Sequence, residues 1–382
     1  MPGTAPWAVV FGGPSPEHEI SILTGLQAER VLTAAGHDVV PIYWSPTGDW
    51  FRVPAGTEAQ DYLEGAPRDA TVLEARVSGD PGLYRRKKFG AERLDIEAAL
   101  LCLHGGVGEG GGAATVFSLL GIPATGSTLF AGAVGMDKLA FGGLMTATGI
   151  PSLPREAVST LTEPAFDGPY IVKPRFGGSS IGIEIAEDVE AARALAASSV
   201  HLRTGAVVEP YRPELVDLNI SFRTFPELEI TQLEKPLRGE AGSALYSYAE
   251  KYLAGGAGAD AGLTSAPREF PAEVPEAVHA RARELAERVA DVTRLTGIVR
   301  VDLLLDEATG ELFVNEVNTI PGALSLYLWA PQRAAATVLV DALTEARDRR
   351  VVFPQAGFGG GAALRAAGGI AGKLVGLDGP RA

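Results

Sequence analysis

The sequence predicts a soluble α/β protein, and three observations support this expectation. Short apolar runs typical of strands alternate along the chain with amphipathic runs of helical period, the pattern of an α/β fold. Several apolar runs end in glycine-rich turns, which is where open α/β sheets bind ligands. The length of 382 residues allows a large core and two or three domains.

Composition and charge narrow the classes of function. Hydrophobic residues make up 46% of the chain and charged residues 21%, which is typical of a globular protein. The net charge of −14 argues against binding to nucleic acid or to an anionic membrane, because both need a basic surface. No apolar run reaches the roughly 18 residues of a membrane span, and the N-terminus lacks the pattern of a signal peptide. We expect a cytoplasmic protein that acts on small molecules.

The N-terminal third is expected to form a small open sheet. “WAVVF” predicts a strand, and “GGPSPEHEISILTG” leads from it into a helix that begins near Glu17. “HDVVPIYW” and “AALLCLHGG” predict further strands. Cys102, the only cysteine, is expected to be a small buried side chain, and a single cysteine allows no disulfide within the chain. “GIPATGS” closes this region near Ser127.

The remaining chain continues the alternation. “LFAGAVGMDKLAFGGLMTATG” predicts one helix, “PYIVKP” a strand, “EDVEAARALAASS” a helix, and “AVVEP” and “DLNISFRT” lead into a third region. Residues 239–262 are rich in glycine and alanine without periodicity, which predicts a functional lid or a disordered segment. The buried stripe of a long helix is marked by Val278, Ala282, Leu285, Val289 and Val292. The tail from Gln355 onward predicts a flexible or loosely docked segment.

One stretch, “GIVRVDLLLDEATGELFVNEVNTIPG”, gathers polar groups on an otherwise apolar pair of strands. The turn-rich “DEATG” between the two apolar runs predicts a β-hairpin. Because side chains alternate along a strand, Arg300 and Asp302 share one face, and so do Glu316 and Asn318. These residues offer hard oxygen ligands suited to Mg²⁺, beside an arginine able to hold an anion. The alternative is an ordinary salt bridge on an exposed face.

The glycine-rich loop “KPRFGGSSIG” is a second candidate binding element. Its glycines let backbone N–H groups approach a phosphate, and Ser179 and Ser180 add hydroxyl donors. Lys173, at the end of an apolar strand, either extends to solvent or meets an anion. Lys138 in “GMDKLA” is by itself best interpreted as a surface lysine of a helix. Lys173 therefore strengthens the prediction that this loop binds a phosphate.

A further strand ends at “HGGVGEGG”, which carries His104 and Glu109. Loops beyond strand ends are common ligand sites in open α/β sheets, although a histidine that caps a turn is the simpler interpretation. The five histidines lack the paired spacing of a transition-metal site, which argues against zinc. The turn “VVFGGPSP” does not match the dinucleotide fingerprint, which argues against a nicotinamide-dependent oxidoreductase.

Taken together, these motifs resemble those of the D-alanine:D-alanine ligases. The resemblance rests on ordered motifs between roughly residues 8 and 350, namely “VVFGGPSPEHEIS”, “LHGGVGEGG”, “GIPATGS”, “MDK”, “VKPRFGGSSIGI”, “YSYAEKY”, “VRVDLLLD” and “NEVNTIPG”. It implies an ATP-grasp fold of three α/β domains, with ATP between the central and C-terminal ones. The implied boundaries are 1–126 for the N-terminal domain on the first-substrate side, 127–209 for the central domain, 210–350 for the C-terminal domain with lid and metal site, and 351–382 for the tail.

The resemblance also implies an activity and residue roles. The enzyme would use ATP to activate one amino acid as an acyl phosphate and join it to a second, most simply two D-alanines for peptidoglycan. ATP would be held by Lys138, Lys173, Ser180, Glu209, Tyr211, Asp217 and the lid residue Lys251. Two Mg²⁺ ions, or Mn²⁺, would be bound by Asp302, Glu316 and Asn318. The first amino acid would be oriented by Glu17, Ser179 and Tyr252 and would lie beside His104. The oxyanion would accept hydrogen bonds from Arg300 and from the N–H of Gly322.

The sequence departs from the family where the second substrate is expected to bind. The family usually has hydroxyl residues after “NTIPG”, whereas this chain continues “ALSLYLW”. Tyr327 stands where a serine is expected, and Ser325 would share its face if the segment is extended. An alternative is therefore a relative that uses a different second amino acid in a specialised pathway; a more distant one is a nucleotide-binding regulator without catalysis. Family members are often dimers, so a homodimer is also implied.

Overall fold

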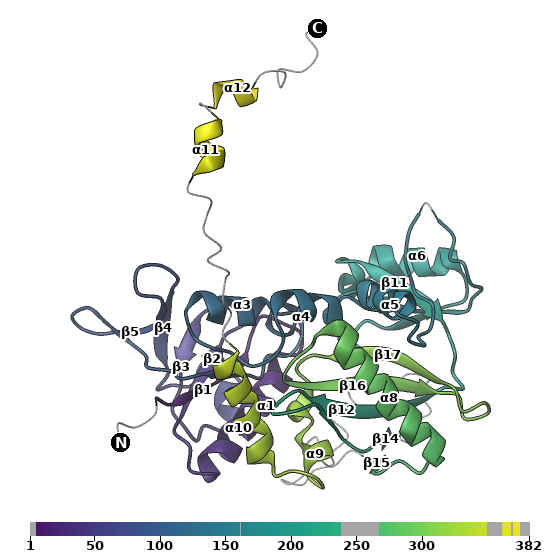
Figure 1. Ribbon diagram of the computed structural model, residues 1–382, viewed down its shortest axis with the longest axis horizontal. Coiled ribbons are helices and arrows are strands. Elements are labelled where there is room, and N and C mark those ends of the chain that lie inside the picture. Colours follow the sequence, from purple (N-terminus) through teal and green to yellow (C-terminus); the bar gives the residue numbers. More distant parts are fainter. Residues whose placement is uncertain (1–4, 161, 238–266, 350–360, 368–369, 375–382) are drawn as a thin grey trace. The chain divides into compact units, whose positions relative to one another are not determined.

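The computed structural model of the chain describes residues 5–160, 162–237, 267–349, 361–367 and 370–374. Three larger sheets and a two-stranded ribbon lie within residues 5–349 of this described part (Figure 1). Helices lie between and over these sheets, so the α/β alternation predicted from the sequence is confirmed. Among the described residues, no helix combines the length and apolar character needed to cross a bilayer.

The first sheet has the order β6-β5-β4-β3-β2-β1-β7. Its parallel part, with β1 between β2 and β7, contains the three predicted strands. The antiparallel meander from β3 to β6 was not predicted, because its strands are short and carry many charged residues. The bounds are Trp7–Gly12 for β1, Val39–Trp44 for β2, Trp50–Arg52 for β3, Thr71–Arg76 for β4, Gly82–Arg86 for β5, Ala91–Arg93 for β6 and Ala99–Leu101 for β7.

Helices α1 (His18–Ala34), α3 (Gly112–Leu119) and α10 (Ala335–Asp348) pack against the parallel part of this sheet. Close packing of α1 depends on Gly25, where an added Cβ would lie 2.4 Å from Cβ of Phe11. The same core includes Leu339 and Leu343 of α10, so the end of the described residues 267–349 returns to the first sheet. Short helices here are η1 (Ala59–Tyr62) and α2 (Gly106–Glu109).

The single helix predicted over residues 129–149 is two helices, α4 (Leu129–Met136) and α5 (Lys138–Ala147). The break lies at Asp137, whose backbone is extended. Its side chain accepts hydrogen bonds from the N–H groups of Leu139 and Ala140, which caps the start of α5. This new helix start places Lys138 in the first turn of α5.

The second sheet has the antiparallel order β10-β9-β11-β8. Helix α6 (Val189–Ser198) covers it, with Ala192 buried against Val172 and Val208 in the same core. The bounds are Glu156–Ala157 for β8, Tyr170–Pro174 for β9, Glu184–Ala186 for β10, Ala206–Pro210 for β11 and Val200–Leu202 for the short helix η2.

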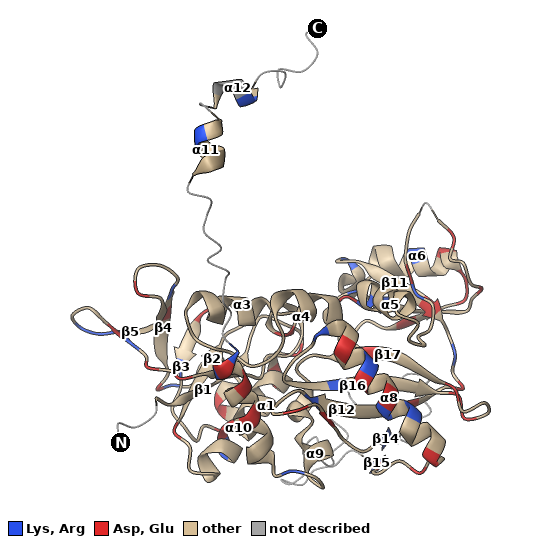
Figure 2. Cartoon of the chain, viewed as in Figure 1, with Lys and Arg blue, Asp and Glu red and all other residues tan. Residues whose placement is uncertain are grey.

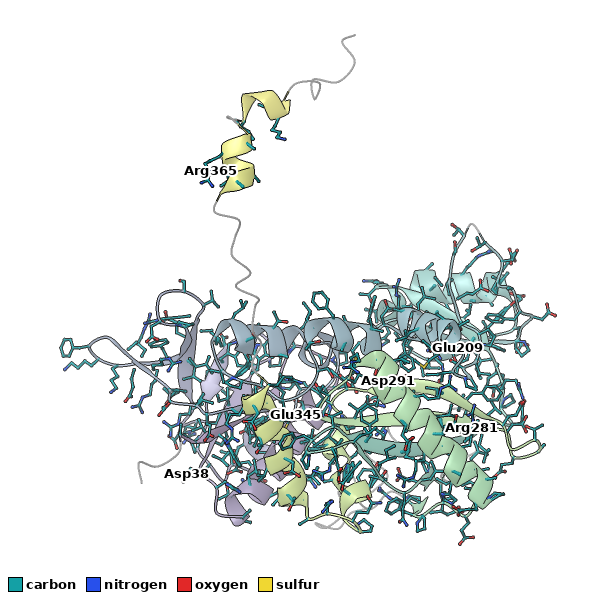
Figure 3. The ribbon with its side chains drawn as sticks, in the orientation of Figure 1. Asp38, Glu209, Arg281, Asp291, Glu345 and Arg365 are labelled. Atoms are coloured by element: carbon teal, nitrogen blue, oxygen red, sulfur yellow. The ribbon has the colours of Figure 1, made fainter. Side chains whose placement is uncertain are left out.

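The third sheet has the antiparallel order β13-β12-β16-β17 and packs on α8 (Glu276–Thr293). The predicted stripe of α8 is confirmed, with four positions buried and Val292 partly buried in the same core. Charged residues lie along the other side of α8 (Figures 2 and 3), where the side chains of Arg281 and Asp291 are 37% and 80% exposed. The bounds are Val216–Arg223 for β12, Glu229–Ile230 for β13, Ile298–Leu305 for β16, Leu312–Asn318 for β17, and Lys235–Pro236 and Arg268–Glu269 for the ribbon strands β14 and β15.

After β17 the chain forms η4 (Gly322–Ser325) and α9 (Leu326–Trp329). The backbone of Ala323, Leu324 and Ser325 has φ near +50°, the left-handed region that side chains with a Cβ rarely adopt. Residues 350–382 form a separate unit, in which the structure describes two short helices, α11 (Ala362–Ala366) and α12 (Ala371–Leu374). The sequence pattern of the tail had not predicted these helices.

Candidate active site

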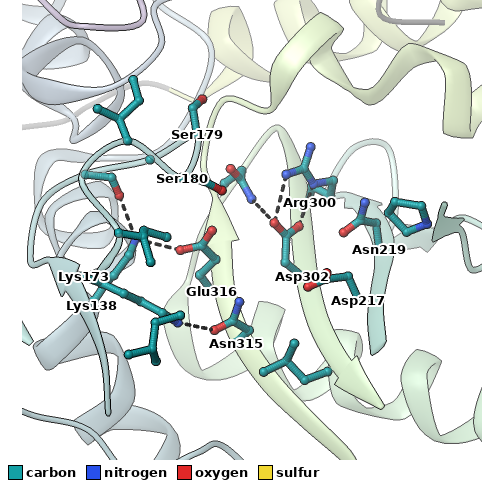
Figure 4. A pocket seen from close by; sticks show the side chains of 18 of the residues that line it. Lys138, Lys173, Ser179, Ser180, Asp217, Asn219, Arg300, Asp302, Asn315 and Glu316 are labelled. Atoms are coloured by element: carbon teal, nitrogen blue, oxygen red, sulfur yellow. Dashed lines mark hydrogen bonds and ion pairs between the residues drawn. The ribbon is translucent and has the colours of Figure 1, made fainter. Parts of the chain in front are cut away.

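The β16–β17 hairpin presents the four predicted polar residues on one face. Arg300 pairs with Asn318 and Asp302 pairs with Glu316 across the two antiparallel strands. The alternate residues Val301 and Leu303 are buried on the other face. The predicted hairpin and its polar face are therefore confirmed. Figure 4 shows the side chains of Arg300, Asp302 and Glu316 in the pocket.

A β-bulge in this hairpin brings in Asn315, which the sequence analysis missed. Asp302 pairs with Glu316 but the next residue, Leu303, pairs with Val314, so Asn315 is the extra residue on β17. Strict alternation would point Asn315 and Glu316 to opposite faces, yet both line the same pocket. The Oδ1 of Asn315 accepts a hydrogen bond from Nζ of Lys173 at 3.3 Å.

The two hairpin carboxylates are held by cations and by an amide. Asp302 accepts hydrogen bonds from Nε and Nη2 of Arg300 at 2.6 and 2.9 Å, and from Nδ2 of Asn318 at 3.1 Å. Glu316 forms an ion pair with Nζ of Lys138 at 2.7 Å. In the described part of the chain, no three His, Cys, Asp or Glu side chains cluster as metal ligands. The available donors are two carboxylates and a carboxamide, a hard oxygen set that fits Mg²⁺ or Mn²⁺ rather than zinc.

Two buried lysines lie beside the hairpin (Figure 4). Lys173 on β9 donates from Nζ to Oε2 of Glu209 at 2.8 Å. Lys138 donates to the carbonyl oxygen of Gly177 at 2.7 Å, in the glycine-rich loop. It is 8% exposed, so the interpretation as a surface lysine was wrong. The cause is the helix break at Asp137, which turns the first residue of α5 inward.

Glu209 and Asp217 lie on β11 and β12, consecutive strands that belong to the second and third sheets. Glu209 on β11 is 1% exposed. Burial acts to raise its pKa, but the charges of Lys173 and Arg155 lower the pKa below its ordinary value. Asp217 lies on β12 opposite Leu304, and both line the pocket with Tyr211. This side of the pocket thus combines the buried negative charge of Glu209, the aromatic ring of Tyr211 and the partly buried carboxylate of Asp217.

The glycine-rich loop contacts the start of α1. Ser179 donates a hydrogen bond from its hydroxyl to Oε1 of Glu17. Ser179 and Ser180 have φ of 50° and 59°, so the loop backbone is in the left-handed region at two successive serines. An added Cβ at Gly178 would lie 3.0 Å from Oε2 of Glu17, and this glycine therefore permits the close approach of loop and carboxylate.

His104 and Glu109 connect the first sheet to the end of β17. Nδ1 of His104 lies 2.8 Å from the carbonyl oxygen of Ile320, and Nε2 lies 2.8 Å from the hydroxyl of Thr24. Burial lowers the pKa of His104 to about 4, so the ring is neutral and Nδ1 carries the proton donated to the carbonyl. Burial, and then the negative charge of Glu17, raises the pKa of Glu109 to about 7.

Tyr327 and Ser325 do not share a face. Residues 323–325 have a left-handed backbone and residues 326–329 form a helical turn, so the segment is not extended and the premise of that expectation was wrong. Tyr327 lines the pocket, whereas Ser325 is fully buried and is not among the lining residues. Burial, and then the charge of Glu234, raises the pKa of the Tyr327 phenol, which stays protonated and donates to Oε2 of Glu234 at 3.2 Å.

A polar cluster around Tyr327 was not found from the sequence. Glu234 also accepts from Nδ2 of Asn219 at 3.1 Å and from Nη1 of Arg268 at 3.1 Å. The guanidinium of Arg268 lies 4.3 Å from the centre of the Tyr327 ring. These residues come from separate segments between 219 and 327, and no local spacing indicated their contact.

One pocket collects most of the predicted site. Apart from Ser325, every predicted site residue that the structure describes lines this pocket. These residues are Glu17, His104, Lys138, Lys173, Ser179, Ser180, Glu209, Tyr211, Asp217, Arg300, Asp302, Glu316, Asn318, Gly322 and Tyr327. Lys251 and Tyr252 of the predicted lid lie outside the described residues. The lining comes from both the second and the third sheet, so the pocket lies between two antiparallel sheets.

Solved structures share the fold over most of the chain. D-alanyl-alanine synthetase A from Vibrio cholerae matches with a TM-score of 0.73 and 21% identity over 91% of this chain and 99% of its own. VanG D-Ala:D-Ser ligase from Enterococcus faecalis matches with a TM-score of 0.72 and 21% identity over 90% of this chain and 100% of its own. The fold is thus the ATP-grasp fold. The class follows from the family model described as D-ala D-ala ligase C-terminus, which matches more than half of the chain: the protein is an ATP-dependent carboxylate–amine ligase, a class that uses ATP and a divalent metal ion.

Sequence relatives define the family within this class. The family models described as D-ala D-ala ligase N-terminus and C-terminus match residues 7–127 and 132–345. D-alanine–D-alanine ligase from Kineococcus radiotolerans is 33% identical over 90% of this chain and 96% of its own length. The enzyme of the same name from Mycolicibacterium vanbaalenii is 32% identical over 85% and 91%. The chain belongs to the D-alanine–D-alanine ligase family.

Proposed function

We propose that this protein joins two D-alanines into D-alanyl-D-alanine for peptidoglycan. The observation that carries the proposal is the shared pocket, in which the Lys138–Glu316 and Arg300–Asp302 pairs lie in the same lining as the Glu17–Ser179 contact. Such a site can hold a nucleoside triphosphate beside an amino acid whose ammonium group forms an ion pair with a carboxylate. The close relatives named D-alanine–D-alanine ligase support this substrate pair.

In this proposal the nucleotide lies between the second and third sheets. Lys138 and Lys173 contact its phosphates, with Ser180 of the glycine-rich loop and Lys251 completing the contacts. Glu209 and Tyr211 border the adenine, and Asp217 receives the ribose hydroxyls. Two Mg²⁺ ions, or Mn²⁺, would be held by Asp302, Glu316 and Asn318, and they would supply charge neutralisation during phosphoryl transfer.

The first D-alanine is oriented by residues from the first sheet. Glu17 accepts its ammonium group, and Ser179 fixes Glu17 through its hydrogen bond. Tyr252 completes the set that orients this substrate, and neutral His104 lies beside the substrate without adding charge. The carboxylate oxygen attacks the γ-phosphorus, ADP leaves, and an acyl phosphate forms. Lysine side chains facing the phosphates offset the charge that develops on the transferring group.

The second step forms the amide. The amine of the second D-alanine attacks the acyl carbon, and the tetrahedral oxyanion accepts hydrogen bonds from Arg300 and from the N–H of Gly322. Phosphate leaves with the original carboxylate oxygen, and the amine loses a proton. Arg300 can serve here because Asp302 orients its guanidinium through two hydrogen bonds, at 2.6 and 2.9 Å.

A second candidate function is the ligation of D-alanine to a different acceptor amino acid. The observation that favours it is the cluster of Tyr327, Glu234 and Arg268, which places a bulky ring and a guanidinium in the pocket lining. A tyrosine reshapes an acceptor site more than a serine does, because its ring occupies space while its phenol still donates. Fold alone does not choose between the acceptors, since proteins of this fold include a D-Ala:D-Ser ligase.

The test is phosphate release from Mg-ATP with purified protein and a panel of D- and L-amino acids, singly and in pairs, with products identified by mass spectrometry. Release with D-alanine alone and a dialanine product supports the first proposal. Release only with D-alanine and another acceptor supports the second. ATP binding without release in any mixture contradicts both and supports a nucleotide-binding regulator.

A further inference from the structure

A buried arginine outside the pocket, Arg155, contacts three segments that each carry a pocket residue. Its Nη1 donates to the carbonyl oxygen of Lys138 at 3.0 Å, and its Nη2 donates to the carbonyl oxygen of Asn315 at 2.8 Å. Its Nε lies 3.3 Å from Oε1 of Glu209. The side chain is 2% exposed, and Arg155 is not among the residues that line the described pocket.

Each residue that Arg155 contacts is either proposed to contact ATP itself or binds a side chain that is proposed to do so. Lys138 extends its own Nζ to Glu316 on the hairpin. The other oxygen of Glu209 accepts from Lys173, and so does the side chain of Asn315. A guanidinium is planar and rigid, so its three contacts hold α5, β11 and β17 at fixed mutual positions. One side chain therefore sets the spacing of two lysines and a hairpin carboxylate.

The negative charge in this network also depends on Arg155. Glu209 is 1% exposed, and a carboxylate so buried needs more than one cation to stay ionised. Nζ of Lys173 lies 2.8 Å from Oε2 of Glu209, and Nε of Arg155 lies 3.3 Å from Oε1. If Arg155 were absent, Lys173 would be the only cation in direct contact with Glu209 in the described structure, and it would be drawn more strongly toward Glu209 and away from a phosphate.

The chain leaves space for this side chain in α5. A Cβ added at Gly142 would lie 2.4 Å from Cδ and 2.8 Å from Nε of Arg155. The next residue, Gly143, has no atom within 4 Å of such a Cβ. A methyl group at 142 must therefore displace the guanidinium, whereas a methyl group at 143 extends into open space. The two glycines form a matched pair for an experiment.

We propose that Arg155 is a positioning residue for ATP, which sets the distance between Lys138 and Lys173 without touching the nucleotide. The inference rests on the ATP site proposed above, but not on the identity of either amino acid. Lysine at position 155 would keep a positive charge but could not make three contacts in fixed directions. The role is therefore one of geometry as well as charge.

The experiment measures the Kd of a non-hydrolysable ATP analogue with Mg²⁺ by calorimetry, together with KM for ATP and for the first amino acid. Arg155→Met and Gly142→Ala are expected to raise Kd and KM for ATP about 10-fold, the effect of weakening one charge-assisted contact. Arg155→Lys should restore only part of the loss, and Gly143→Ala should match the unaltered protein. KM for the first amino acid should change less than about twofold, because the Glu17–Ser179 contact is untouched.

Nucleotide binding needs no amino acid, so this result is independent of the proposed substrate. If Arg155→Met does not fold, as judged by circular dichroism and thermal unfolding, Gly142→Ala against Gly143→Ala decides the question. Unchanged Kd in folded Gly142→Ala would overturn the proposal. So would equal increases of KM for ATP and amino acid, or full restoration of Kd by Arg155→Lys.

Discussion

Asp302 and Glu316 lie directly opposite one another on β16 and β17, immediately before a β-bulge. Directly opposed residues of an antiparallel pair have Cβ atoms about 5 Å apart. Two carboxylates so close repel each other unless cations lie beside them. Here Arg300 forms an ion pair with Asp302, and Lys138 forms one with Glu316. The pair proposed to bind a divalent metal ion is therefore positioned by strand register rather than by a loop.

The first prediction concerns Glu316. Glu316→Gln removes one of the two carboxylates proposed to bind the metal ions, together with the ion pair to Lys138. We expect kcat to fall by roughly 10²-fold or more, because charge on the transferring phosphoryl group is then less well neutralised. ATP should still bind with weakened affinity. Steady-state kinetics and calorimetry measure the two effects. Glu311→Gln, at an exposed position of the same hairpin, is the control; equal losses in both variants would contradict the assignment.

The second prediction concerns the bulge residue. Asn315→Leu keeps the size of the side chain and the carbonyl that Arg155 contacts, but it removes the acceptor for Lys173. We expect KM for ATP to rise by roughly 3- to 10-fold, which corresponds to about 0.7–1.4 kcal/mol, the net contribution of a typical hydrogen bond, with kcat less affected. An unchanged KM for ATP would show that the Lys173–Asn315 contact has no part in nucleotide binding.

The third prediction concerns the acceptor side. Tyr327→Phe removes the hydrogen bond to Glu234, while Asn219 and Arg268 still satisfy that carboxylate. The free energy of unfolding should fall by about 0.5–1.5 kcal/mol. KM for the second amino acid should rise while KM for ATP stays constant, as measured with the first amino acid saturating. A rise in KM for ATP alone would place Tyr327 elsewhere in the reaction.

The fourth prediction is a pH dependence of stability. His104 has its pKa lowered by burial to about 4 from an ordinary value of 6.5, so between these pH values the unfolded chain binds a proton that the folded chain does not. Its contribution is complete above pH 6.5 and is lost as the pH falls toward 4, by about 1.4 kcal/mol per pH unit.

The measurement compares denaturant unfolding of the unaltered protein and of His104→Gln across this pH window. The stability advantage of the unaltered protein should shrink steadily as the pH falls from 6.5 to 4. Exposed His201→Gln is the control for the loss of a histidine. Parallel curves for the unaltered protein and His104→Gln would mean that His104 takes up its proton equally in both states.

Much of the site could be predicted because it is built on regular strands. Alternation placed Arg300, Asp302, Glu316 and Asn318 on one face, and the register of the hairpin agrees. The side chain of Asn315 could not be placed, because a bulge interrupts the alternation without a glycine or proline to signal it. From its local sequence alone Lys138 was interpreted as a surface lysine, because the helix break at Asp137 falls inside an apolar run that has the period of one helix.

Long-range contacts account for the other failures. Glu234 and Arg268 meet Tyr327 through tertiary structure, and Arg155 reaches Glu209 and Asn315 across two sheets. A side chain whose partners are far away in the sequence has no local pattern to reveal it. The antiparallel strands β3 to β6 were missed for a different reason, since their many charged residues resemble those of loops.

The central claim is that the carboxylate of D-alanine is activated by ATP in this pocket. The most direct test uses D-alanine labelled with ¹⁸O in both carboxylate oxygens, incubated with Mg-ATP and the protein, with the released phosphate analysed by mass spectrometry. The account predicts one ¹⁸O atom in each phosphate, because the carboxylate oxygen that attacks phosphorus leaves with it when the amide forms. Phosphate without label would show that ATP is split by water, and it would contradict the ligase mechanism proposed for this site.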